Sequence, residues 1–76
     1  MSNYEVLKTT NPLRVSLIKK LRGIWDHDDY ILGILILIET DEEVKKLLEY
    51  IEEGMWETTS DILTEAVFID YERKNN

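Results

Sequence analysis

The chain has 76 residues and no cysteine, which excludes disulfides and thiolate metal sites. A single domain of this size buries only about 60% of the surface that its unfolded chain exposes, so a disulfide, a metal or a partner subunit usually adds stability. The formal net charge is −7. Since nucleic-acid binders usually carry a basic face, we expect no nucleic-acid ligand.

The charge is unevenly distributed along the chain. Residues 1–25 carry five basic side chains against one acid, a balance of +4, whereas residues 26–76 carry four basic side chains against fifteen acids, a balance of −11. This pattern is typical of an acidic, solvated surface beside one mixed helix. Residues 1–10 lack the basic and then apolar pattern of a secretory signal, so we expect a cytoplasmic protein.

We divide the chain into an N-terminal arm, residues 1–10, and one helical domain, residues 11–76. The arm has no helical period. Its alternation of Tyr4 and Val6 with their neighbours is compatible with a short edge strand or an ordered arm.

Asn11 and Pro12 predict the start of a helix over residues 12–25. Asn is a good N-cap, and Pro at the first helical position loses nothing because its N–H would be unpaired in any case. Large aliphatic side chains then fall near one line of the helix: Leu13, Leu17, Leu21 and Ile24. Basic side chains occupy the other side, so this helix is amphipathic.

Tyr30–Ile38 is a stretch of nine residues without a charge, between acidic flanks. It is too short to span a bilayer, which needs about 20 residues, so we expect the rest of the chain or a second copy to enclose it on every face. A cap at Asp28 or Asp29 and the scarcity of partner strands favour a helix over residues 29–39. The alternative is an α/β domain with residues 30–38 as a central buried strand, because periodicity alone does not separate the two.

Thr40 to Glu43 is a capping box that predicts a helix over residues 41–53. The Thr40 hydroxyl can accept from the backbone of Glu43 while the Glu43 carboxylate reaches back to Thr40. Apolar side chains then mark one face at i, i+3, i+4 and i+7: Val44, Leu47, Leu48 and Ile51. Gly54 is placed to end the helix.

A last helix is predicted over residues 60–73, with Thr58, Thr59 and Ser60 as alternative caps. Its apolar stripe, about 160° wide by the geometry of 3.6 residues per turn, consists of Ile62, Leu63, Ala66, Val67 and Ile69. Asp70 lies within the same arc near the end of the helix, and we expect it to be exposed. The predicted fold is therefore an all-α bundle of four short helices.

Residues 26–29, Asp-His-Asp-Asp, form the only cluster of metal-ligand side chains. A metal site needs about four converging donors, whereas neighbours in a turn point in different directions. The calcium-loop spacing also fails, because Tyr30 and Ile31 stand where an oxygen donor and Gly are required. One histidine and scattered serines give no nucleophile and base that the sequence can place together. We predict a cap-rich turn, with no catalytic residue, no metal and no cofactor.

Aromatic side chains are numerous for so small and acidic a chain. Trp and Tyr anchor interfaces because they bury a large area with little loss of rotamer freedom. Phe68 falls outside the predicted stripe and Trp56 lies in a connection, although small cores also use such residues to cover their ends. The candidate interface residues are Trp25, Tyr30, Ile34, Trp56, Phe68 and Tyr71.

These features favour a non-enzymatic protein–protein interaction or regulatory module of bacterial or phage type. We expect a homodimer or a second protein as the partner, and neither nucleic acid nor membrane. One alternative is an acidic inhibitor or nucleic-acid mimic, in which residues 39–57 block a basic groove. A less favoured alternative is a small metal-dependent enzyme centred on residues 26–29.

Overall fold

The computed structural model describes residues 3–75, and within them every regular element is helical. The elements are η1 (Asn3–Lys8), a 3-10 helix, and the α-helices α1 (Pro12–Arg22), α2 (Asp28–Leu37), α3 (Asp41–Glu53) and α4 (Thr59–Lys74). The prediction of an all-α bundle is confirmed. Tyr30–Ile38 forms no strand, so the α/β alternative is wrong.

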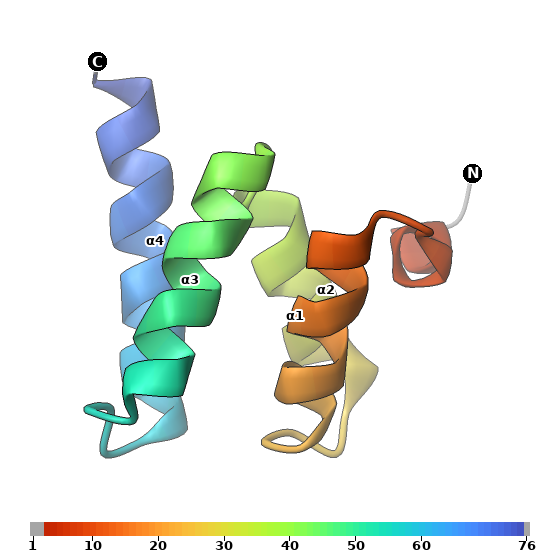
Figure 1. Ribbon diagram of the computed structural model, residues 1–76, viewed down its shortest axis with the longest axis horizontal. Helices are drawn as coiled ribbons and strands as arrows, with labels where there is room; N and C mark the ends of the chain where they lie inside the picture. The colour runs from red at the N-terminus through yellow and green to blue at the C-terminus, as the bar shows by residue number, and fades with distance from the viewer. Residues whose placement is uncertain (1–2, 76) are drawn as a thin grey trace.

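The helices pack as two layers in a molecule of 30 × 29 × 20 Å. Figure 1 shows α1 and α3 side by side in front, α2 behind them, α4 flanking α3, and η1 on the far side of α1 and α2. α2 contacts η1, α1 and α4, while α3 contacts α1 and α4. α2 is thus covered by three elements from separate parts of the chain.

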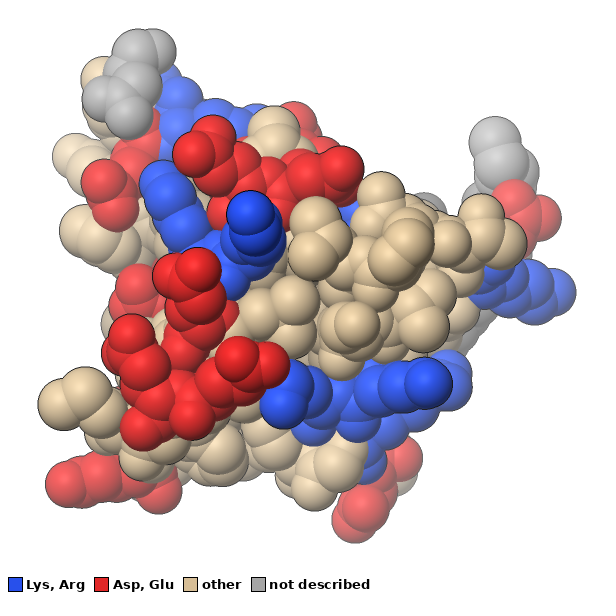
Figure 2. All heavy atoms as spheres, viewed as in Figure 1, with Lys and Arg blue, Asp and Glu red and all other residues tan. Residues whose placement is uncertain are grey.

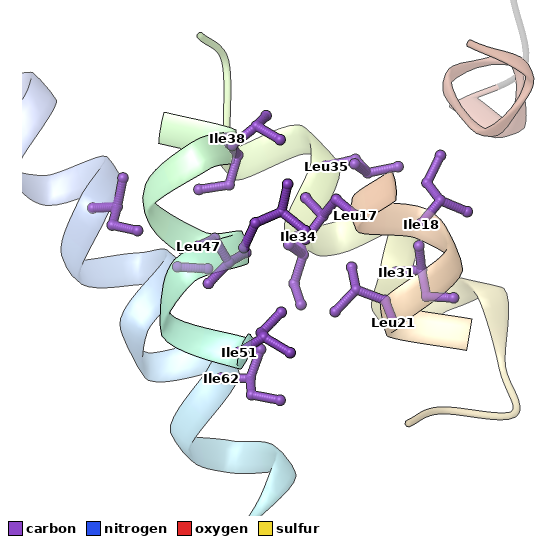
Figure 3. Packing of buried hydrophobic residues seen from close by; sticks show 14 residues of the cluster. Leu17, Ile18, Leu21, Ile31, Ile34, Leu35, Ile38, Leu47, Ile51 and Ile62 are labelled. Atoms are coloured by element: carbon purple, nitrogen blue, oxygen red, sulfur yellow. The ribbon is translucent and has the colours of Figure 1, made fainter. Parts of the chain in front are cut away.

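α2 contributes the centre of the core because its apolar side chains point in several directions (Figure 3). Ile31, Ile34 and Ile38 at its end are completely buried. Tyr30 and Ile36, by contrast, are 52% and 54% exposed. The rest of the chain therefore does not enclose this segment at these two positions.

Neighbouring helices supply the rest of the core. Leu17 and Leu21 of α1, Leu47 of α3 and Ile62 of α4 are all completely buried and converge on α2 (Figure 3). Burying one such side chain contributes about 1.5–3 kcal/mol relative to leaving it exposed. The core therefore depends on all four helices at once.

The predicted helix starts at residues 11 and 40 are confirmed in detail. Asn11 Oδ1 accepts from the N–H groups of Leu13 and Arg14, at 3.0 and 3.2 Å. Thr40 Oγ1 accepts from Glu43 N–H at 3.2 Å. The Glu43 carboxylate accepts from the Thr40 hydroxyl at 2.9 Å rather than from its backbone, so the predicted box forms with a different second bond.

Other predicted boundaries need correction. α1 ends at Arg22, not at residue 25, because the chain turns at Gly23 and the N–H groups of Ile24 and Trp25 both donate to Leu21. α2 begins after His27, which makes no side-chain cap; Asp28 and Asp29 instead lie in its first turn. Carboxylates there favour the positive end of the helix dipole, which stabilises the start without a cap.

Of the two forms expected for the N-terminal arm, an edge strand or an ordered arm, the edge strand is wrong. Residues 3–8 form η1, which packs against α2. No neighbouring strand exists in residues 3–75 for it to pair with, and a 3-10 turn satisfies backbone groups locally. Residues 1 and 2 of the predicted arm lie outside the described part of the chain.

Substitution of two glycines by alanine should change stability in opposite directions. Gly33→Ala should raise the free energy of unfolding by about 1 kcal/mol, because Ala favours helix over Gly and an added Cβ meets no atom within 4 Å. Gly54→Ala should lower it by about 1–2 kcal/mol, because Gly54 ends α3 at φ 68°, where a Cβ is strained. Urea denaturation measures both; destabilisation by Gly33→Ala would contradict the helical, open environment of residue 33.

Candidate interaction surface

α4 is apolar on two opposite faces, and only one of them is covered. Its inner face buries Ile62, Ala66 and Ile69 against the bundle. Its outer face leaves four large apolar side chains exposed: Leu63 at 38%, Val67 at 50%, Phe68 at 52% and Tyr71 at 61%. We call these four residues the outer face of α4. A helix that is apolar all round is normally buried all round.

α3 shows what an ordinary surface helix of this chain looks like. It buries Val44, Leu47, Leu48 and Ile51 on one side. Its exposed positions are charged: Asp41, Glu42, Lys45, Lys46, Glu49, Glu52 and Glu53. Figure 2 shows the side of the molecule that carries α1 and α3, where red and blue side chains surround an uncharged area. The outer face of α4 therefore departs from the pattern of its neighbour.

A hollow at the start of α4 connects the outer face to the beginning of α2. Trp25 and Tyr30 stack with ring centroids 5.9 Å apart and ring planes at 18°. They line a cavity of about 330 Å³ together with Thr59, Ser60 and Leu63. Since Leu63 belongs to both, the stacked pair and the outer face of α4 form adjoining surfaces.

The six predicted interface residues lie in different environments. Phe68 and Tyr71 are exposed on α4, and Tyr30 is exposed beside half-buried Trp25. Trp56 is also half-buried, and its indole N–H donates to the carbonyl of Ile51 at 3.0 Å, so it covers the end of α3. Ile34 is completely buried and presents no surface to a partner.

Leu63 and Val67 belong to the predicted apolar stripe of α4, yet both are exposed and are interface candidates. The predicted stripe of α4 was too wide, since only Ile62, Ala66 and Ile69 face inward. A signal was present in the spacing: Leu63, Val67 and Tyr71 recur at i, i+4 and i+8, which defines a second apolar line on a helix.

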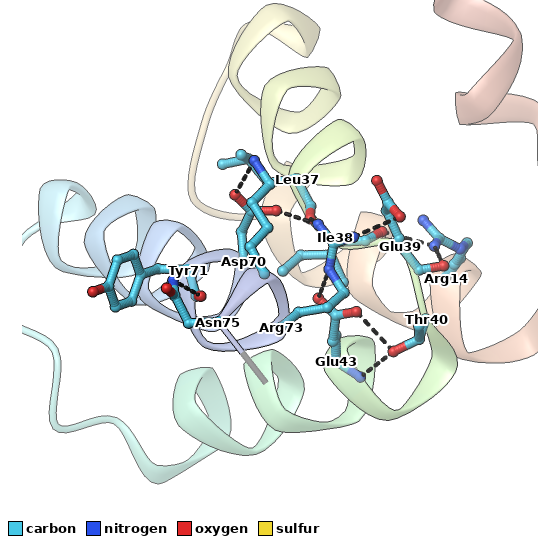
Figure 4. Close-up of polar contacts among 11 residues, drawn as sticks. Arg14, Leu37, Ile38, Glu39, Thr40, Glu43, Asp70, Tyr71, Arg73 and Asn75 are labelled. Carbon is cyan, nitrogen blue, oxygen red and sulfur yellow. Dashed lines mark hydrogen bonds and ion pairs between the residues drawn. The ribbon is translucent and has the colours of Figure 1, made fainter.

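Arg73 fixes the end of α4 against α2 and α3 (Figure 4). Its Nη1 lies 2.7 Å from Glu39 Oε2, and its Nε lies 3.2 Å from Oε2 of buried Glu43. A third carboxylate partner is Asp70, one turn earlier on α4. Arg73 Nη2 also donates to the carbonyl of Leu37 at 3.5 Å. One guanidinium thus joins three helices and the α2–α3 connection.

Asp70 is buried, so the prediction of an exposed side chain is wrong. Its carboxylate is paired with Arg73 and also lies 3.1 Å from Lys74 Nζ. A buried charge is tolerated when it is paired and hydrogen-bonded. Figure 4 shows Asp70 and Arg73 pointing toward α2 and α3, while Tyr71 points away from them. The polar cluster therefore lies on the side of α4 that faces the bundle, and the outer face of α4 lies on the side that faces solvent.

Hydrogen bonds and charges shift four pKa values. The hydrogen bond from Lys74 lowers the pKa of Asp70, which Arg73 lowers further. The N–H groups of Thr58 and Glu57 lower the pKa of Asp61 at the start of α4. Burial alone acts to lower the pKa of Arg73, but its carboxylate partners outweigh it and raise that pKa. Burial, with the Asp61 and Glu65 carboxylates nearby, raises the pKa of Tyr50.

The turn at residues 26–29 brings its polar side chains to the surface. His27 is exposed, and Asp28 Oδ1 lies 3.6 Å from Arg22 Nε. Within residues 3–75, no three His, Cys, Asp or Glu side chains are grouped so that they could hold a metal ion. The same described residues contain no helix that is long and apolar enough to cross a membrane.

Comparison with models of protein families, with curated proteins and with solved structures found no match. The surface of the molecule is therefore the basis for the functional argument.

Acid should destabilise the protein as Asp70 and Asp61 gain protons. Folding lowers the pKa of both carboxyl groups. Their contribution to the free energy of unfolding is therefore fully present above the ordinary carboxyl pKa of 3.8, and it is lost as the pH falls through the lower pKa values of the folded state. We expect Asp70→Asn to unfold at a lower temperature than the wild type at pH 7 and to lose less stability between pH 5 and pH 2. Thermal unfolding followed by circular dichroism measures both.

Asp26→Asn is the matched control, because Asp26 is exposed in the turn. It should follow the wild-type curve. Equal acid sensitivity of Asp70→Asn and wild type would contradict the role assigned to the Asp70 ion pairs.

Proposed function

We propose that this protein is a non-enzymatic interaction module that docks a protein partner on the outer face of α4. The observation that carries the proposal is the exposure of Leu63, Val67, Phe68 and Tyr71 along one helix. Single exposed apolar residues are normal on a protein surface, but a continuous line of them marks an interaction site.

The energetics favour docking at this face. Fully burying a side chain such as Val, Leu or Phe contributes about 1.5–3 kcal/mol, and about half of that surface is still available here. Phe68 and Tyr71 add aromatic area at a low cost in rotamer entropy. Arg73 holds the helix in place from behind through Glu39 and Glu43. The surface is therefore available in a fixed geometry before a partner arrives.

Mimicry of a nucleic acid is supported less well. α3 exposes Glu42, Glu49 and Glu52, but Lys45 and Lys46 lie among them on the same helix. A mimic of phosphates needs a surface of one sign. The outer face of α4, which is uncharged over its four residues, gives the clearer assignment.

Substitution of Tyr71 should remove binding without unfolding the chain. Tagged wild-type protein, captured from its source cell with nuclease present, should retain a stoichiometric protein, whether another copy or a different chain. Tyr71→Glu should lose at least nine-tenths of that partner, because a carboxylate replaces an apolar anchor. Quantitative mass spectrometry of the captured material gives the ratio.

Ile36→Glu is the control, because Ile36 is 54% exposed on α2 rather than on α4. It should retain the partner, and both variants should keep the wild-type circular dichroism spectrum. Capture by Tyr71→Glu at the wild-type level would contradict the proposed docking face.

A further inference from the structure

We propose that the occupant of the outer face of α4 is a second copy of this chain, with the two α4 helices antiparallel across a two-fold axis that passes between Val67 and Tyr71. This inference rests on the proposed function and names its partner. The spacing of the exposed residues, the placement of the carboxylates and the position of Lys74 each support it.

Five exposed positions of α4 lie along one line of the helix, which we call the seam; its middle is apolar and its ends are polar. Exposed positions recur at intervals of four, three, four and three: Ser60, Thr64, Val67, Tyr71 and Lys74. This alternation keeps one line of side chains toward a partner helix over several turns. Leu63 and Phe68 flank the line on either side, which widens its apolar middle. The seam is thus most apolar between residues 63 and 71.

The carboxylates of α4 lie away from this seam. Asp61 and Glu65 are close enough to Tyr50 of α3 to influence its hydroxyl. Glu72 lines a cavity with Glu42 and Lys46 of α3, and Asp70 is buried beside Arg73. The chain carries a net charge of −7, so two copies repel one another unless the contact excludes acids. The seam meets this condition.

A basic protein partner would bind more favourably to the acidic surface of α3 than to the seam of α4. Glu49, Glu52 and Glu53 are exposed on α3, and basic side chains gain most from contact with such acids. A face without carboxylates on an acidic protein is suited to another acidic surface. The charge pattern therefore favours a second copy over a basic partner.

The position of Lys74 selects the antiparallel arrangement. In a parallel pair the two Lys74 side chains would meet at the same end of the seam, and like charges that face each other destabilise a pair. In the antiparallel pair, Lys74 of each copy lies beside Thr64 of the second copy. The same axis places Val67 against Tyr71 of the second copy, twice by symmetry, and brings the two Phe68 rings together.

Sedimentation equilibrium from about 1 μM to 1 mM tests the assignment. Wild type should pass from monomer to dimer with a dissociation constant in the micromolar range, as suits a small interface. Val67→Glu and Tyr71→Glu should each weaken dimerisation by at least tenfold. Ile36→Glu, an equivalent change at a residue of similar exposure, should leave it unchanged.

Single cysteines test the register, because the chain has none of its own. Under mild oxidation, an equimolar mixture of Val67→Cys and Tyr71→Cys chains should give the mixed dimer in clearly more than the twofold excess over each disulfide-linked homodimer that random pairing produces. Excess of the Val67→Cys homodimer would overturn the proposed axis.

A monomer at every concentration, or a dimer that Val67→Glu and Tyr71→Glu leave intact, would overturn the assignment of a second copy. The proposed function is tested separately. It survives a monomeric result if Tyr71→Glu still loses a different captured protein, and it fails if no captured protein depends on Tyr71.

Discussion

The constraint on which the structure depends is the burial of α2. Its aliphatic side chains point in several directions, and a helix of this kind has to be covered from several sides. η1, α1 and α4 each cover one side of it, and Ile31, Ile34 and Ile38 become completely buried. α1, α3 and α4 supply the other buried apolar side chains of the core. The arrangement of the other helices follows from this requirement.

α4 helps to cover α2, but α4 itself then has an apolar face that no other part of the bundle covers. Burial of Ile62, Ala66 and Ile69 sets the rotation of α4 about its own axis, and Arg73 pairs with Glu39 and Glu43 on the same side of the helix. With that rotation fixed, Val67 and Tyr71 face solvent. The packing that completes the monomer thus also leaves an apolar surface of α4 facing outward, which links the stability of the fold to the proposed docking.

Local patterns predicted much of the fold. Residues 41–53 were predicted with their final boundaries because Thr40 and Gly54 give strong signals at both ends. The predictions for Asp70, expected to be exposed, and for Val67, assigned to the apolar stripe, were wrong for the same reason. Periodicity shows that apolar side chains line one side of a helix, but it does not show which side faces the core. That choice depends on the packing of α4 against α2 and α3, which includes the contact of Arg73 with Glu39, 34 residues away in sequence, and no local pattern contains such contacts. Of the candidate interface, Phe68 was predicted because it falls outside the stripe, and Tyr71 because Tyr side chains anchor interfaces.

The most direct test of the central claim is an isotope-filtered NOE measurement on a mixed sample, in which half of the chains are uniformly ¹³C-labelled and the other half are unlabelled, so that contacts within one chain are filtered out. The methyl groups of Val67 should show NOEs to the ring protons of Tyr71 in the unlabelled chains, because the proposed two-fold axis brings these side chains into contact. Absence of any NOE between chains at millimolar concentration, or NOEs that connect Val44 or Val6 instead of Val67, would contradict the account.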